Sequence, residues 1–165
     1  MADDYNLKSL PQRAARANKA NRKLVQRLKK VNPRKLDAII HRLHDEVFEY
    51  IDCLKCANCC RSISPIIIDK DIERISRHLK MKPSEFTAKY LEQDDDGIYG
   101  FNHTPCPFLG DDNYCTIYKL RPRACAEYPH TDRPRVYQAL DLSIKNTGIC
   151  PAVYEIFEKL KEMNY

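Results

Sequence analysis

The feature that most constrains this chain is a run of four cysteines within eight residues, Cys53-x-x-Cys56-x-x-Cys59-Cys60. On a helix, steps of three residues would carry successive thiols progressively off one face. In a loop, two intervening residues let successive thiolates converge on one metal ion or cluster. The spacing therefore predicts a loop wrapped around a metal centre.

Four more cysteines follow in the chain of 165 residues: Cys106, Cys115, Cys125 and Cys150. Cys106 and Cys150 each precede a proline, as the remote ligand of bacterial ferredoxin-type clusters does. Eight thiolates suit two four-sulfur sites, or one cluster with a second zinc or iron site. Because the sequence has no second C-x2-C pair, a zinc ribbon fits less well than an iron–sulfur cluster. We predict that all eight cysteines bind metal.

Other roles for single thiols stay open at this point. A cysteine such as Cys125 is also suited to a small buried core position. Cys56 and Cys59 have the spacing of a redox pair, but the strand-to-helix setting expected for that motif is missing. Packing alone gives no reason for four thiols in eight residues. Metal binding is therefore the interpretation that accounts for the run as a whole.

The N-terminal sequence MADDYNLKSL lacks the basic-then-apolar pattern of a secretory signal. No apolar run approaches the roughly 20 residues needed to cross a bilayer. We therefore expect a cytoplasmic protein without a membrane span. In a reducing compartment, eight thiols are metal ligands or redox groups more often than structural disulfides.

Positive charge is concentrated at the start of the chain. Residues 1–35 carry eleven Lys or Arg and two Asp, an excess of nine positive charges, whereas the whole chain carries +5. The remaining residues therefore carry a net −4. We predict two parts, a basic helical arm over residues 1–35 and a Cys-rich metal-binding domain over residues 36–165. Residues 8–35 could dock an unknown protein partner, and we do not expect nucleic-acid binding because no aromatic residues are interleaved with the charges.

The hydrophobic pattern predicts a mainly α fold with minimal sheet. Helices are expected over residues 11–31, 33–52, 70–80, 83–92 and 152–163, with Asp69 as a helix N-cap. A short strand is expected over residues 98–102. Residues 105–135 are rich in proline and show little periodicity. We expect this stretch to form a small irregular, metal-organised core against which the amphipathic helices pack.

The cysteines and their neighbours resemble a known family. The run ending in Cys60-Arg61 is followed by Cys106-Pro107-Phe108-Leu109, Cys115-Thr116-Ile117-Tyr118 and Arg121-Pro122-x2-Cys125, and then by Tyr128-Pro129. This order resembles the YkgJ family, which is described as zinc- or iron-chelating, over about residues 53–130. The resemblance implies metal binding by Cys53, Cys56, Cys59, Cys60, Cys106, Cys115 and Cys125. A related cysteine motif occurs in flagellin lysine-N-methylases, where it accompanies an iron–sulfur cluster.

Three functions are compatible with these residues. The favoured one is a metal-binding protein that holds an iron–sulfur cluster, [4Fe–4S] in type, or Zn²⁺ and acts in redox chemistry or metal handling. The second is a zinc-stabilised interaction module whose basic arm recruits a partner. The third is a cluster-dependent modifying enzyme related to flagellin lysine-N-methylase. No phosphate-binding glycine loop and no hydrolytic Ser, His and Asp grouping stands out, so an enzymatic role stays undecided and a non-enzymatic one is favoured.

Overall fold

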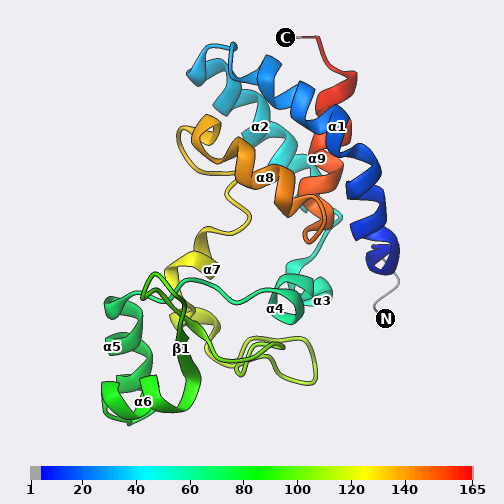
Figure 1. The fold of residues 1–165 in the computed structure, drawn as a ribbon. Helices are drawn as coiled ribbons and strands as arrows, with labels where there is room; N and C mark the ends of the chain where they lie inside the picture. Colours follow the sequence, from blue (N-terminus) through cyan, green and yellow to red (C-terminus); the bar gives the residue numbers. More distant parts are fainter. Residues whose placement is uncertain (1–4, 165) are drawn as a thin grey trace. The chain divides into compact units, whose positions relative to one another are not determined.

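The structure is a computed structural model that describes residues 5–164. Helices dominate, and the sheet among these residues has two short strands, β1 (Leu91–Gln93) and β2 (Tyr99–Phe101). The predicted mainly α fold with minimal sheet is confirmed. The chain divides into two compact units (Figure 1), a helical unit of Met1–Cys56 with Pro129–Tyr165 and a cysteine-rich unit of Ala57–Tyr128.

Four helices build the helical unit: α1 (Leu10–Leu28), α2 (Pro33–Phe48), α8 (Leu140–Asn146) and α9 (Pro151–Glu162). Two 3-10 turns, η1 (Leu7–Ser9) and η3 (Val136–Ala139), and the single helical turn α3 (Cys53–Cys56) complete its elements. Helix α9 contacts both α1 and α2, and α8 contacts α1. The α9 helix lies within a residue of its predicted bounds, whereas α8 was not predicted.

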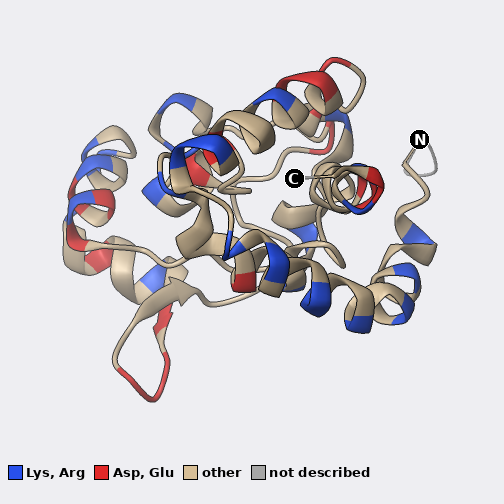
Figure 2. Ribbon diagram, turned by 90° about the horizontal axis from the view of Figure 1, so that it is seen from above, with Lys and Arg blue, Asp and Glu red and all other residues tan. Residues whose placement is uncertain are grey.

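Helix α1 is part of the core of the helical unit. Its buried side chains recur at helical spacing: Leu10, Ala14, Asn21, Leu24, Val25 and Leu28. The apolar side of this helix, which lies within the segment expected to dock a partner, therefore packs against other helices of the same chain. Figure 2 shows that Lys and Arg recur along the rest of this helix, which leaves its basic face exposed. The two compact units are defined by contacts between residues. The predicted arm of residues 1–35 was defined by its positive charge, so its end at residue 35 is not a boundary between these units.

Helix α2 begins where the sequence predicts and ends four residues early. The Asn32 side chain accepts hydrogen bonds from the backbone N–H groups of Arg34 and Lys35, which caps the helix next to Pro33. Its buried face is Leu36, Ile40, Leu43 and Val47. The helix ends at Phe48, so a short connection separates it from Cys53.

The cysteine-rich unit has shorter elements. They are α4 (Asn58–Ser62), α5 (Asp69–His78), α6 (Pro83–Tyr90), the two strands, the 3-10 turn η2 (Tyr118–Leu120) and α7 (Arg123–Glu127). The strands pair antiparallel, with Leu91 opposite Phe101. One small core joins these elements, and its buried members are Ile67, Ile72, Ile75, Phe86, Leu91, Phe101, Phe108 and Ile117.

The prediction for the start of α5 is off by one residue. The helix begins at Asp69, and Ile68 occupies the N-cap position. Asp71, in the first turn, supplies the capping carboxylate, because its Oδ2 accepts from the Ile68 N–H at 3.3 Å. A carboxylate in the first turn is stabilised by the unpaired N–H groups of the helix start. Asp71 is fully buried, whereas Asp69 is exposed.

Candidate metal centre

The run from Cys53 to Cys60 lies in two short helical pieces, so the prediction of a loop is wrong. Cys53–Cys56 forms α3 and Asn58–Ser62 forms α4. Between them, Ala57 has a positive φ of 47°, a left-handed conformation that ends one helical piece before the next begins. The thiols therefore do not follow the rotation of one continuous helix. The boundary between the two compact units falls at this break, after Cys56.

Cys60 joins the run to a later cysteine of the same unit. Its carbonyl oxygen accepts a hydrogen bond from the Cys106 N–H at 2.7 Å. A hydrogen bond from the Cys59 thiol, together with the positive charge of Arg61, lowers the pKa of Cys60 to about 7, although burial opposes the change. Both lowering causes favour the thiolate form of Cys60. Thiolates are the form that binds metal.

Cys106 and Cys115 are held by a tight loop. Leu109 pairs with Cys115 in an isolated antiparallel bridge, and the Thr116 N–H donates to the Phe108 carbonyl at 2.9 Å. Both cysteines pack, partly buried, against the small core of the unit. Burial raises the pKa of Cys106 to about 11 and also raises that of Cys115. In each case the neighbouring thiol of Cys60 raises the pKa further.

Cys125 lies on α7, and the start of this helix is anchored by Asp71. The Arg123 N–H donates to both carboxylate oxygens of Asp71, at 3.2 and 3.3 Å. Arg74 completes the anchor, because its Nη2 lies 2.6 Å from Asp71 Oδ1 and also donates to the Arg121 carbonyl at 3.1 Å. Burial raises the pKa of Cys125 to about 12.

Four thiols of the cysteine-rich unit therefore lie within electrostatic reach of one another, and we call Cys60, Cys106, Cys115 and Cys125 the four-thiol set. After burial, the causes that raise the pKa of Cys125 are the thiols of Cys106, Cys60 and Cys115. Arg121 opposes this change at both Cys115 and Cys125. Its guanidinium also lies 4.1 Å from the centre of the Tyr118 ring.

The residues that flank these thiols have the following roles in the structure. Phe108 and Ile117 are buried in the core, whereas Tyr118 is half exposed. Arg61 hydrogen-bonds Asn113 and lowers the pKa of Cys60. Arg123, which is largely exposed, pairs with Glu127 at 2.6 Å and acts as a surface salt-bridge partner.

The other thiols that the structure groups are Cys53, Cys56 and Cys150, which we call the three-thiol set. All three belong to the helical unit. Burial raises the pKa of Cys150 to about 12, and the thiols of Cys53 and Cys56 raise it further. Cys150 immediately precedes α9, and its side chain, like that of Cys56, is 8% exposed.

Within residues 5–164, no three His, Cys, Asp or Glu side chains already surround a point where a metal ion could be held. The chemistry of the donors nevertheless fits zinc or iron, because thiolates are the soft ligands that these metals take in proteins. Two of the histidines contact other polar side chains. His103 Nδ1 lies 2.7 Å from the Asn102 amide oxygen, and His44 Nδ1 lies 2.7 Å from Thr131 Oγ1.

Sequence reasoning missed Asp71. The residue positions Cys125 through the backbone of Arg123, although 52 residues separate the two partners. A local signal existed, since Asp71 lies three residues after the N-cap of an amphipathic helix, where a capping-box carboxylate is common. That signal predicts the helix start and says nothing of the contact with α7.

The family relationship of the chain comes from comparison with known proteins. No helix in the described part of the chain has the length and apolar character needed to cross a bilayer. Neither the curated proteins nor the solved structures include a significant match to this chain. The model of one family, CxxCxxCC, described as "Putative zinc- or iron-chelating domain", matches residues 52–151 and so spans all eight cysteines. Because this match covers more than half of the sequence, the chain belongs to the CxxCxxCC family of zinc- or iron-chelating domains.

Proposed function

We propose that this protein holds a [4Fe–4S] cluster on the four-thiol set and acts in redox chemistry or metal handling in a reducing compartment, the cytoplasm. The observation that carries the proposal is that four thiols from separate segments of one compact unit lie within electrostatic reach of one another. Cys60 comes from α4, Cys106 and Cys115 from one tight loop, and Cys125 from α7. Four thiolates are the ligand number of such a cluster.

The way in which the ligands enter the set favours iron–sulfur over zinc. No two members of the set form a C-x2-C pair with each other, whereas zinc ribbons take their ligands from two such pairs. Cys106 precedes Pro107, as a ligand of ferredoxin-type clusters does. Two members of the set, Cys106 and Cys115, also pack against a core of aromatic and aliphatic side chains that includes Phe108 and Ile117. Such an apolar wall limits water access and tunes a cluster's reduction potential.

Two arginines complement the charge of this site. Four thiolates would bring more negative charge than a cluster neutralises, and Arg61 and Arg121 favour the ionised form of the thiols beside them. When bound, the cluster supplies one-electron transfer. The chain's own residues supply the ligands, the positive charge and the exclusion of water.

A second candidate is a zinc-stabilised interaction module, and the exposed basic face of α1 favours it. Lys and Arg side chains recur on this face while the apolar face packs inside the helical unit. The face within residues 8–35 would then recruit an acidic protein partner, and the metal would contribute folding free energy alone.

Anaerobic purification separates these functions. We expect coloured protein with iron and acid-labile sulfide in equal amounts, and loss of both in Cys106→Ser and Cys125→Ser. Ser62→Ala, an exposed position in α4, serves as the control and should keep its iron. Colourless protein with stoichiometric zinc and no sulfide would contradict the cluster and support the zinc module.

A further inference from the structure

A pocket in the helical unit has no part in holding metal. It has a volume of about 330 Å³, and we call it the tyrosine pocket because Tyr5, Tyr50 and Tyr154 line it. Of the described residues that line it, none is a cysteine. Pockets that bind small molecules in proteins measure roughly 300–1,000 Å³. The tyrosine pocket lies at the lower end of this range, so its size suits a small metabolite.

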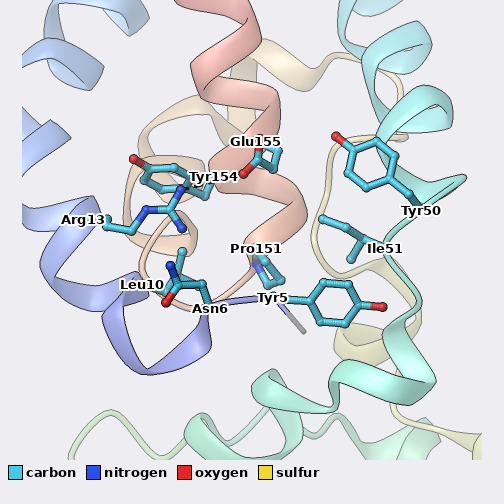
Figure 3. A pocket seen from close by; sticks show the side chains of 9 residues that line it. All are labelled: Tyr5, Asn6, Leu10, Arg13, Tyr50, Ile51, Pro151, Tyr154 and Glu155. Carbon is cyan, nitrogen blue, oxygen red and sulfur yellow. Dashed lines mark ion pairs between the residues drawn. The ribbon is translucent and has the colours of Figure 1, made fainter. Parts of the chain in front are cut away.

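Helical spacing directs two groups of side chains into this pocket. On α1, Leu10 and Arg13 lie one turn apart. On α9, Pro151, Tyr154 and Glu155 lie within one turn of one another. Figure 3 shows Arg13 beside Tyr154, and Glu155 between Arg13 and the opposite wall, which comes from the connection after α2. The two charged side chains of the pocket therefore face the same space.

The Arg13 guanidinium is held by an aromatic ring and keeps its hydrogen-bond donors. Its central carbon lies 4.2 Å from the centre of the ring of Tyr154, a residue that is 9% exposed. Stacking on a ring face orients the guanidinium plane and leaves its N–H groups at the edge. Within residues 5–164, these N–H groups donate no hydrogen bond. Arg13 is therefore prepared to bind a carboxylate through two parallel N–H groups.

Glu155 lies beside Arg13 but too far away for a hydrogen bond. Arg13 Nη2 and Glu155 Oε1 are 3.8 Å apart, whereas a charge-assisted hydrogen bond measures roughly 2.7–2.9 Å. The two side chains are 34% and 39% exposed, so this ion pair contributes little to stability and a ligand can displace it. Glu155 repels a ligand with negative charge alone, and Arg13 repels one with positive charge alone. The pair therefore favours a ligand that carries both charges.

The rest of the pocket surface described here is largely apolar or aromatic. Leu10, Ile51 and Pro151 are buried, and all three line the pocket. Tyr50 is 54% exposed, so a ligand can reach the pocket from solvent past this ring. An apolar group that packs against these side chains is removed from water, which favours binding.

We propose that the tyrosine pocket binds an α-amino acid with an apolar or aromatic side chain. The carboxylate of the ligand accepts hydrogen bonds from Arg13, and its ammonium group donates to Glu155. One carbon atom separates these two groups in an α-amino acid, so they lie side by side, as the Arg13 and Glu155 side-chain ends do. The ligand side chain packs against Leu10 and Ile51. No metal takes part, so the proposal is independent of the cluster.

Isothermal titration calorimetry on the full-length protein tests the ligand class without any substitution. The probes are L-phenylalanine and L-leucine, and we expect saturable binding of at least one. For L-phenylalanine the matched analogues are 3-phenylpropionate, without the ammonium group, and 2-phenylethylamine, without the carboxylate. For L-leucine they are 4-methylpentanoate and 3-methylbutylamine. Each analogue should bind about tenfold more weakly or worse, because it leaves a charged group of the pocket without a partner.

Two substitutions test the positions of the charges. Arg13→Gln and Glu155→Gln should each weaken binding of the amino acid about tenfold or more, since each removes one charged partner. Both side chains are partly exposed, so both variants are expected to fold, which circular dichroism checks. Arg16→Gln, at an exposed position of α1 outside the pocket lining, is the matched control and should bind as the parent protein does.

Nuclear magnetic resonance locates the bound probe in the parent protein. Backbone amide signals of residues 10–13 and 151–155 should shift as the amino acid is added. Three results would overturn the proposal: no saturable binding of either amino acid, an analogue that binds as tightly as its amino acid, or shifts confined to other parts of the chain. Unchanged affinity in either Arg13→Gln or Glu155→Gln would overturn it as well.

Discussion

The helical unit and the cysteine-rich unit carry their thiols on different kinds of scaffold. In the helical unit, α1, α2 and α9 bury a large set of aliphatic side chains, and the three thiols lie at helix ends beside this core. In the cysteine-rich unit, the elements are short, and Cys106 and Cys115 of the four-thiol set pack against a small core. A unit with little apolar area relies more on a bound metal. We therefore expect metal bound by the four-thiol set to contribute more to the stability of its unit than metal bound by the three-thiol set would to the helical unit.

Metal removal should produce the largest difference between the two units. When a chelator strips the metal, we expect backbone amides of residues 57–128 to exchange hydrogen at least a hundredfold faster, because metal binding contributes on the order of 10 kcal/mol to small sites of this kind. Amides in the middle of α2 and α9 should change little. Hydrogen exchange with mass spectrometry measures both regions in one sample, and equal acceleration in the two units would show that their frameworks do not differ.

Asp71→Asn should have the next largest effect. The substitution removes a buried charge that accepts from Ile68, Arg74 and Arg123, and it places an N–H₂ group against N–H donors. Loss of hydrogen bonds to a charged group costs about 2 kcal/mol of unfolding free energy. Urea denaturation monitored by circular dichroism measures the loss. Asp69→Asn, at an exposed position of the same turn, should change the stability by less than about 0.5 kcal/mol.

Asn21→Leu should act in the opposite direction and in the other unit. The Asn21 side chain is fully buried, and neither its amide nitrogen nor its amide oxygen has a hydrogen-bond partner. A buried polar group without a partner is destabilising by about 1 kcal/mol or more, so an apolar side chain should raise the urea midpoint by about that amount. Gln26→Leu, at an exposed position of α1, controls for the change in hydrophobicity. A lower midpoint in Asn21→Leu would indicate that this site needs a polar side chain.

The smallest expected effect is a difference in the pH dependence of thiol reactivity. It should distinguish Cys60 from Cys106 within the four-thiol set. In the metal-free protein, alkylation of Cys60 should rise with pH around pH 7, because the thiolate is the reactive form and its pKa lies near 7. Alkylation of Cys106 should keep rising to about pH 11. Peptide mapping across pH gives both profiles. Cys59→Ala should move the Cys60 midpoint toward 9 more than Arg61→Gln does, since the hydrogen bond from Cys59 is the larger cause.

Most helices were predictable because their causes are local. Helix α9 is entered through Cys150-Pro151 and buries Val153, Ile156 and Phe157 at helical spacing, a pattern visible without any structure. Helix α8 was missed, because it follows a 3-10 turn and has only seven residues. The loop expected at Cys53–Cys60 was wrong for a similar reason. Whether a single left-handed residue such as Ala57 interrupts a helix depends on its surroundings.

The sequence alone predicted which cysteines belong to the candidate site. It did not predict which of them fall in the four-thiol set and which in the three-thiol set. Eight cysteines, the run at Cys53 and the later Cys-Pro steps determined by themselves that the chain chelates metal, because thiolates at such spacing have few other uses. Only the tertiary structure places the thiol of Cys60 where it acts electrostatically on Cys125, and that of Cys56 where it acts on Cys150. Distances between residues far apart in sequence depend on long-range packing, such as the contact of Asp71 with Arg123. No local pattern records such contacts, and they separate one run of cysteines into two groups.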